Sequence, residues 1–172
     1  TTKVGIIGGT GKMGQFFGKF FEEGGCKVLI SSRKTNLKPE ECAKKSDVVI
    51  VSVPIESALN VIKFIGPFVS KPSVLMDTTS IKKLPVKTML DNSNCEVIGM
   101  HPVFGPNVSS IKGQTIVLCP GRGKKWLRWV IKTLDEGGAR IKIATPEKHD
   151  KMMSVIQGLN HFSALAVAHA MK

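Results

Sequence analysis

The sequence predicts a doubly wound α/β fold with a mostly parallel sheet, followed by a long C-terminal helix. Three observations predict this class. Short apolar runs recur along the chain, and segments long enough for a helix separate them. A glycine-rich turn directly follows the first apolar run. Beyond residue 144, a helical apolar pattern replaces these short runs.

The predicted strands are short apolar runs bounded by Gly, Pro, Ser or Asp, a pattern typical of strands buried on both faces. In chain order they span residues 4–7, 27–30, 48–51, 73–76, 96–99, 115–118 and 140–143. Amphipathic helices are predicted between them, because apolar residues recur there at spacings of three and four. The clearest helical segments span residues 12–21, 55–65 and 126–134. Right-handed crossovers between these strands give the doubly wound sheet.

The last segment predicts one helix that extends beyond the first domain. Thr145 is a suitable N-cap residue, and Pro146 suits the first helical position. An apolar stripe then continues to the chain end, interrupted only by Gly158. A helix of about 27 residues would be ~40 Å long, and its Ala-rich end needs a packing partner outside the domain. We therefore predict two units, residues 1–144 and residues 145–172.

Length and composition exclude several classes of protein. The chain has 172 residues, of which 42% are hydrophobic and 22% charged, unlike a disordered or fibrous chain. Its apolar runs are much shorter than the ~20 residues that span a bilayer, so we expect no membrane partner. The glycine-rich turn lies too near the N-terminus for a signal peptide, which predicts a cytoplasmic protein. The four cysteines lack C-x-x-C spacing, which predicts free thiols and no metal site.

The charge balance predicts an anionic ligand. The chain carries 25 basic and 13 acidic residues, for a net charge of +12, without a basic tail. Such a field attracts phosphates and carboxylates. One basic run, residues 122–128, has two tryptophans beside it but no interleaved stacking aromatics. We interpret that run as the solvated face of a helix and expect no nucleic-acid partner.

The strongest local motif is G-x-G-x-x-G, which lies between a predicted strand and a predicted helix. Its glycines suit a tight turn, close approach of the backbone to a pyrophosphate, and close packing of helix on strand. The N-terminus of the following helix then faces the anion. This context predicts a Rossmann-like dinucleotide-binding domain. The cofactor-binding residues predicted here are Gly9, Thr10, Gly11, Lys12, Met13 and Gly14.

The end of the second strand predicts the type of cofactor. An NAD-preferring site places Asp or Glu there to bind the ribose hydroxyls, whereas this chain has Ser31, Ser32, Arg33 and Lys34. Hydroxyls and a guanidinium can bind a 2′-phosphate, and no carboxylate repels it. We therefore predict NADP, with NAD as the alternative cofactor. The other interpretation of this segment is an exposed polar turn without a ligand.

Three further strand ends are expected to border the same crevice, because ligands lie outside the carboxyl ends of the strands in such sheets. Val53 and Pro54 follow the third strand and are expected beside the nicotinamide, as is Thr78 after the fourth. His101 follows the fifth strand in a rigid segment between Gly and Pro, and its side chain suits proton transfer near neutral pH. The alternative is a strand-end histidine that binds backbone.

Four segments occur together in this chain. They read G-G-T-G-x-M-G at residues 8–14, D-x-x-S-x-K at 77–82, G-x-H-P-x-F-G-P at 99–106, and His149-Asp150 followed by His161-Phe162 after ten intervening residues. In combination they resemble the prephenate dehydrogenase family of tyrosine biosynthesis, and the similarity extends over residues 3–169. The H-P-x-F-G-P segment is the most specific part of the resemblance.

The resemblance implies oxidative decarboxylation of prephenate, a dicarboxylate, to 4-hydroxyphenylpyruvate with NADP. His101 would be the catalytic histidine, accepting the proton of the ring hydroxyl as hydride leaves for the nicotinamide, and Ser80 would support both that hydroxyl and His101. The substrate-binding residues would be His161, His149 and Lys82: His161 would contact the substrate beside the cofactor, and His149 would line or brace the site. On a straight helix His149 and His161 lie ~18 Å apart, so they cannot share a metal ion.

Members of the family are longer, and the resemblance implies that an all-helical dimerisation domain follows, which supplies an arginine for the substrate carboxylate. Residues 145–172 would be its first helix, which predicts a homodimer and weak or absent catalysis by this chain alone. Two alternatives stay open. A deazaflavin-dependent NADP reductase is similar at the glycine turn and the Ser-Arg pair but needs no histidine at residue 101. A regulatory module would bind NADP without turnover. Prephenate and arogenate are not distinguished.

Overall fold

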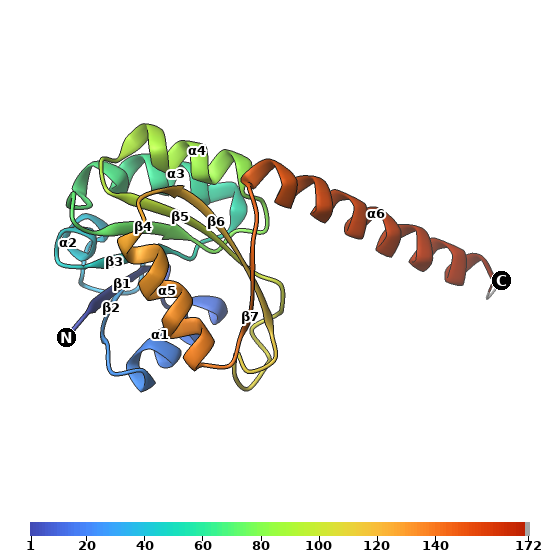
Figure 1. The fold of residues 1–172 in the computed structure, drawn as a ribbon, viewed down its shortest axis with the longest axis horizontal. Coiled ribbons are helices and arrows are strands. Elements are labelled where there is room, and N and C mark those ends of the chain that lie inside the picture. The colour runs from blue at the N-terminus through green and yellow to red at the C-terminus, as the bar shows by residue number, and fades with distance from the viewer. Residues whose placement is uncertain (171–172) are drawn as a thin grey trace.

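A computed structural model describes residues 1–170, apart from the side chain of His161. It contains one seven-stranded sheet flanked by helices, with a long helix projecting from one corner (Figure 1). The strands are β1 (Lys3–Ile7), β2 (Lys27–Ser31), β3 (Val48–Val51), β4 (Val74–Asp77), β5 (Glu96–Pro102), β6 (Thr115–Arg122) and β7 (Arg140–Ile143). The helices are α1 (Lys12–Glu23), α2 (Pro39–Lys44), α3 (Ile55–Ile65), the short 3₁₀ helix η1 (Gly66–Phe68), α4 (Lys83–Asn92), α5 (Lys125–Glu136) and α6 (Pro146–Ala170). The predicted fold class is confirmed.

The strand order is β2-β1-β3-β4-β5-β6-β7, with β1 to β5 parallel. β6 runs antiparallel to β5, and β7 runs parallel to β6. The winding direction changes between β1 and β3, which is where such sheets bind ligands. Ile7 pairs with Val51, Val51 with Asp77, and Asp77 with Gly99. The register therefore aligns the carboxyl ends of β1, β3 and β4 along one edge, and β5 continues beyond it.

Two apolar layers cover the sheet, one on each face. Phe17 and Phe21 of α1 and Val130 and Leu134 of α5 pack with one side of the central strands. Residues of α2, α3 and α4, such as Ile62, pack on the other side. Each residue of β3 is buried, because the parallel strand is covered on both faces and its sequence is a continuous apolar run. Burying each such side chain contributes about 1.5–3 kcal/mol.

Helix α4 is absent from the sequence-based predictions, and the structure gives the reason. Pro85 lies in its first turn, where the missing N–H costs nothing. No side chain of α4 caps its own N-terminus in the described structure. The cap comes instead from Asp150, whose carboxylate accepts hydrogen bonds from the N–H groups of Lys82 and Lys83. A cap contributed from the start of α6 leaves no local sequence signal.

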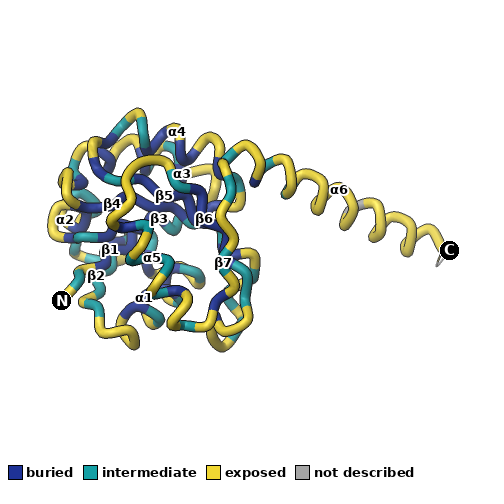
Figure 2. The backbone as a smooth tube through the Cα atoms, in the orientation of Figure 1, coloured by how far each residue is buried: buried dark blue, intermediate teal, exposed yellow. Residues whose placement is uncertain are grey.

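Helix α6 projects away from the domain, with its first turn docked and the rest exposed (Figures 1 and 2). His149 in that first turn is only 1% exposed. Beyond it the exposed large apolar side chains are Met152, Val155, Ile156, Leu159, Phe162, Leu165 and Val167. The predicted long helix is confirmed, whereas its membership of a second domain stays a prediction. None of the helices within residues 1–170 combines the length and apolar character needed to cross a membrane.

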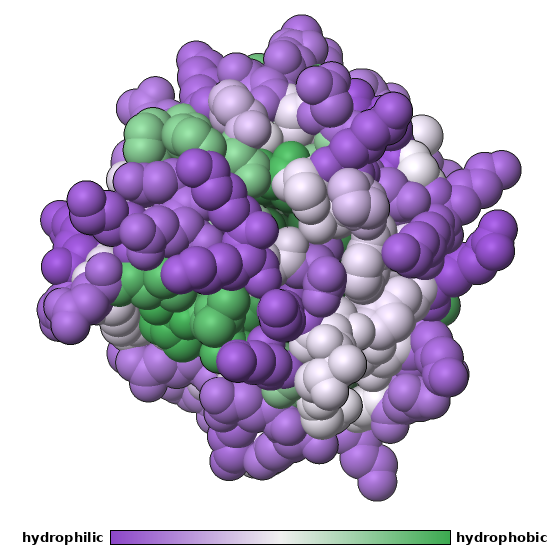
Figure 3. All heavy atoms as spheres, turned by 90° about the vertical axis from the view of Figure 1, so that its left-hand side faces the viewer, coloured by the Kyte–Doolittle hydropathy of each residue, from purple (hydrophilic) through white to green (hydrophobic). Residues whose placement is uncertain are grey.

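The face opposite α6 carries mainly hydrophilic side chains, interrupted by smaller apolar patches (Figure 3). The net charge of +12 is known from the sequence, and a charge of this sign attracts anions through the solvent.

Candidate active site at the carboxyl ends of the strands

The glycine turn after β1 has the geometry of a nucleotide-binding turn. Gly8 has φ of 85°, and a Cβ there would lie 2.2 Å from the carbonyl oxygen of Ser52. A Cβ on Gly14 would lie 2.6 Å from the carbonyl oxygen of Gly8, so only glycine permits this approach of α1 to the turn. Gly11 is different, because its Cβ would meet only the Gly8 oxygen, at 3.3 Å. The turn is therefore open on the side of Gly11, where a pyrophosphate can approach the backbone.

The start of α1 is free to bind an anion. Among the described residues, no side chain caps this helix. The N–H groups of Lys12, Met13 and Gly14 belong to its first turn and have no intrahelical acceptor. Thr10 and Lys12 are exposed beside them. The residues present therefore fit a dinucleotide phosphate at the positive end of the helix dipole.

The loop after β2 presents only part of the predicted phosphate site. Ser31 is buried, and its hydroxyl donates a 2.7 Å hydrogen bond to the carbonyl oxygen of Leu37. The Ser31 hydroxyl therefore stabilises the loop from inside, and its contact with cofactor stays a prediction. The Ser32 hydroxyl accepts from the N–H of Lys34 at 3.0 Å and keeps its own hydrogen to donate. Arg33 and Lys34 are exposed.

The ends of β3 and β4 adjoin the glycine turn. A Cβ on Gly8 would lie 2.7 Å from Cγ1 of Val53, so Val53 flanks the turn directly. Pro54 follows as the N-cap residue of α3 and is exposed. The Thr78 hydroxyl donates to the Ser52 hydroxyl at 3.3 Å, which connects the ends of the two strands. The structure thus brings Val53, Pro54 and Thr78 to the edge that holds the glycines.

A buried ion pair lies behind the end of β4. Asp77 and Lys82 have no exposed side-chain surface, and the Lys82 Nζ donates to the Asp77 Oδ2 at 2.5 Å. The same ammonium donates to the Met100 carbonyl oxygen at 2.9 Å, and Thr79 donates to Asp77 Oδ2 through its N–H and its hydroxyl. Burial lowers the pKa of Lys82, and Asp77 opposes that shift. The ammonium of Lys82 is enclosed by protein here, and its contact with substrate stays a prediction.

The end of β5 carries a chain of hydrogen bonds. His101 is half-buried, and its Nδ1 lies 2.8 Å from Nε2 of His149. The Nδ1 of His149 lies 2.7 Å from Oδ1 of Asp150, the carboxylate that caps α4. His149 is 1% exposed, and its ring holds the ring of His101, as expected of a residue that braces the site. Its contact with substrate stays a prediction.

The environment keeps His101 neutral at physiological pH. Burial, together with His149 and Lys82, lowers the pKa of His101 to about 4 against an ordinary value of 6.5, although Asp150 opposes the shift. Partial burial would raise the pKa of Asp150, but hydrogen bonds from the Lys83 N–H, from His149 and from the Lys82 N–H hold it below its usual range. A neutral imidazole can accept a proton, and His149 connects the ring of His101 to the carboxylate of Asp150.

Two predicted residues are not connected to this network within the described structure. Ser80 is exposed in the segment between β4 and α4 and makes no hydrogen bond with His101. His161 lies on α6, and its side chain is outside the part of the chain that the structure describes.

Conversely, Asp77 and Asp150 are the residues that the sequence-based predictions missed. Asp150 adjoins His149 in a segment already singled out, which was the available signal.

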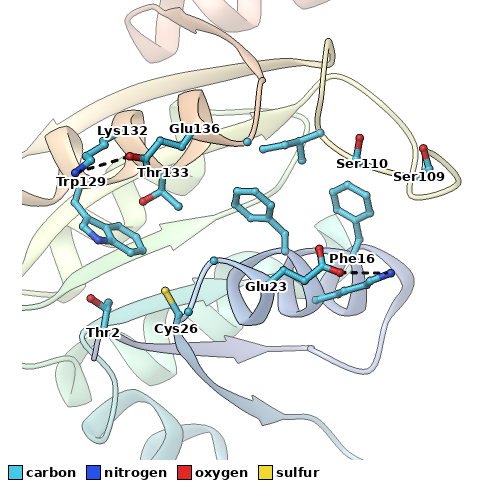
Figure 4. Close-up of a pocket in the computed structure, with 16 residues that line it drawn as sticks. Thr2, Phe16, Glu23, Cys26, Ser109, Ser110, Trp129, Lys132, Thr133 and Glu136 are labelled. Atoms are coloured by element: carbon cyan, nitrogen blue, oxygen red, sulfur yellow. Dashed lines mark ion pairs between the residues drawn. The ribbon is translucent and has the colours of Figure 1, made fainter.

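A separate groove of about 520 Å³ lies between α1 and α5 (Figure 4). Phe16, Phe20, Ile111 and Trp129 contribute its apolar walls. Ion pairs within each helix, Lys19 with Glu23 and Lys132 with Glu136, lie at its margins. None of the predicted site residues lines this groove, so it is distinct from the strand-end edge.

The described residues offer neither a metal cluster nor a reactive thiol. Within residues 1–170, the side chain of His161 apart, no group of three or more His, Cys, Asp or Glu side chains is arranged to hold a metal ion. The four cysteines are free thiols. Burial raises the pKa of Cys42 and of Cys119 to about 11, which disfavours the nucleophilic thiolate at neutral pH.

The doubly wound sheet, its glycine turn and the free start of α1 define a nucleotide-binding domain of the Rossmann type. Comparison with known proteins specifies the family. The family model for the nucleotide-binding domain of prephenate dehydrogenase matches residues 29–143. A probable arogenate/prephenate dehydrogenase from Methanocaldococcus jannaschii is 36% identical over 188 residues, which cover 98% of this chain and 42% of that protein. The chain therefore belongs to the prephenate dehydrogenase family, as the resemblance predicted.

Solved structures agree at the level of the fold. Arogenate dehydrogenase from Synechocystis superposes with a TM-score of 0.85 at 18% identity, covering 98% of this chain and 68% of that one. Prephenate dehydrogenase from Aquifex aeolicus, in complex with hydroxyphenyl propionate and NAD+, gives a TM-score of 0.80 at 22% identity, with 99% and 69% coverage. The chain spans less than half the length of the Methanocaldococcus relative.

Proposed function

We propose that this chain supplies the nicotinamide-binding site and the catalytic base of an NADP-dependent dehydrogenase that converts prephenate to 4-hydroxyphenylpyruvate in tyrosine biosynthesis. The observation that carries the proposal is His101, a neutral, half-buried histidine at the end of β5. Its Nδ1 is occupied by His149, so Nε2 remains for a substrate hydroxyl. The family membership and the names of the relatives support prephenate or arogenate as substrate.

The cofactor would lie across the edge formed by the ends of β1, β2 and β3. The backbone N–H groups at the start of α1 would hold its pyrophosphate, while Val53, Pro54 and Thr78 would flank the nicotinamide. Ser32, Arg33 and Lys34 would bind the 2′-phosphate of NADP. The NAD+ complex of the Aquifex relative supports a nicotinamide cofactor. When bound, this cofactor accepts hydride from the substrate.

The protein side of the reaction is one proton transfer at His101. Its Nε2 accepts the proton of the ring hydroxyl while the hydride on the same carbon departs, which leaves a ketone conjugated with the ring. The bond between the ring and its carboxylate then breaks, carbon dioxide leaves, and the electron pair of that bond moves through the ring to the ring oxygen. The ring becomes aromatic, and the oxygen takes up a proton to give the phenol of 4-hydroxyphenylpyruvate. Ser80 would support the hydroxyl from the segment after β4, and His161 would contact the substrate from α6.

The exposed side of α6 supports a homodimer. Its apolar side chains continue beyond the docked first turn and include Phe162, which is 72% exposed. An apolar face of this extent is stabilised when another surface covers it. A second copy of the chain would provide that surface, together with the helical domain implied by the family. A cytoplasmic location belongs to the same proposal.

The variant His101→Asn tests the proposed function in the full-length protein. Removing a general base lowers turnover by about 10²–10⁴-fold, so formation of NADPH and of 4-hydroxyphenylpyruvate should both fall by that factor. The affinity for NADP should stay unchanged, because His101 lies outside the glycine turn. Equal turnover in wild type and variant would remove His101 from the mechanism. Tight binding of NADP without consumption of prephenate or arogenate would favour the regulatory module.

A further inference from the structure

The hydrogen bonds behind His101 determine where its hydrogen resides. Asp150 accepts from the N–H groups of Lys82 at 2.7 Å and Lys83 at 2.9 Å, so both carboxylate oxygens act as acceptors. The Nδ1 of His149, 2.7 Å from the same Oδ1, must therefore carry a hydrogen. In a neutral ring the Nε2 of His149 is then an acceptor. It can only receive the hydrogen of His101 Nδ1, at 2.8 Å.

We propose that Asp150 is a positioning residue that fixes, through His149, the tautomer in which His101 carries its hydrogen on Nδ1 and leaves Nε2 unprotonated. The catalytic consequence of this tautomer rests on the proposed function, whereas the tautomer itself does not. The backbone of α4 reinforces the arrangement, because the two N–H groups that Asp150 caps hold its carboxylate in place. His149 transmits the constraint from a buried position, 1% exposed.

The opposite tautomers would block the reaction. If the Nε2 of His149 carried a hydrogen, the Nδ1 of His101 would have to accept it, and the hydrogen of His101 would then occupy Nε2. That nitrogen could no longer take a proton from a substrate hydroxyl. Fixing a histidine tautomer with a buried carboxylate is worth several orders of magnitude in other enzymes. Asp150 differs from the carboxylate of those enzymes in two ways. It acts on the base through a second imidazole, and the same oxygens cap a helix.

Long-range ¹H–¹⁵N correlation spectra of the histidine rings test the proposal on the wild-type chain without substrate. At pH 7 the Nδ1 of both His101 and His149 should be protonated, and both Nε2 atoms should show the shift of an unprotonated nitrogen. His101→Asn and His149→Gln assign the signals. Hydrogen on Nε2 of His101, or a cationic His149, would overturn the proposal. This readout is independent of turnover, so an inactive protein with the expected tautomers contradicts only the proposed function.

The variant Asp150→Ala adds a second measurement. Without the carboxylate, the His149 tautomer is no longer fixed, and the Nε2 signal of His101 should move toward the protonated position. Turnover in the full-length protein should fall at least tenfold with unchanged affinity for NADP. Glu147→Ala is the matched control, since it removes an exposed carboxylate from the same helical turn and should leave the ring signals unchanged. Unchanged His101 tautomers in Asp150→Ala would refute the positioning role.

Discussion

The two halves of the strand-end edge differ in the groups that they present. The half formed by β1, β2 and β3 offers backbone N–H groups and exposed polar side chains such as Arg33. The half formed by β4, β5 and the start of α6 consists of polar groups joined by hydrogen bonds, among them the buried Lys82 and His149. An open backbone binds a ligand without needing support from side chains. A buried network fixes the orientation of one base and makes the fold depend on each of its members.

The largest effect that this comparison predicts is on the free energy of unfolding. Lys82→Met leaves Asp77 as a buried carboxylate without its cation, and Asp77 Oδ1 is already the one buried side-chain oxygen or nitrogen without a hydrogen-bond partner among the described residues. Breaking a buried pair in this way costs about 3–5 kcal/mol. Urea unfolding of the 172-residue chain measures the loss.

Lys83→Met is the matched control, because Lys83 is the exposed neighbour and should change the free energy of unfolding by less than about 0.5 kcal/mol. A double variant, Asp77→Leu with Lys82→Met, should recover part of the stability, since apolar replacements of a buried pair are often tolerated. An equal, small effect of Lys82→Met and Lys83→Met would mean that the pair is not buried in solution.

A smaller effect should appear as the pH falls. The pKa of His101 is about 4 in the folded chain, below its ordinary value of 6.5, so unfolding takes up a proton between these values. The contribution of the neutral His101 ring to the free energy of unfolding is therefore fully present above pH 6.5. It is lost as the pH falls toward 4, and the free energy of unfolding decreases by roughly 2–3 kcal/mol.

Unfolding of wild type and His101→Asn at pH 7 and pH 4.5 measures this effect. The wild type should lose more stability than the variant over that interval, because the variant has no proton to take up at this position. Parallel losses in the two proteins would show that the His101 ring titrates at its ordinary pKa.

Some features of the fold could be predicted from the sequence, and others could not. The sheet, the glycine turn and the long last helix follow from periodicity and local motifs, because each depends on residues close together in the chain. The position of His101 at the end of β5 follows from the same pattern. Helix α4 does not, because its cap is Asp150, far along the chain.

The sequence also does not indicate which polar side chains are buried. Lys82 and Ser31 belong to predicted polar clusters, and lysine is almost never fully buried. Their side chains nevertheless point inward, toward Asp77 and toward the Leu37 carbonyl oxygen. Only the packed structure shows that these polar groups have protein partners. His149 likewise occurs in the expected segment but contacts His101.

The smallest predicted effect is in the half formed by β1, β2 and β3, and it concerns only the affinity for cofactor. Arg33 is exposed at the end of β2, so Arg33→Ala should leave the stability of the fold nearly unchanged. A charge-assisted hydrogen bond contributes about 1.5–3 kcal/mol, so the dissociation constant for NADP should rise roughly tenfold or more while that for NAD stays the same. Calorimetric titration with both cofactors measures the ratio, and Arg128→Ala, an exposed arginine on α5, controls for net charge. A similar loss for NADP and NAD would mean that Arg33 does not bind the 2′-phosphate.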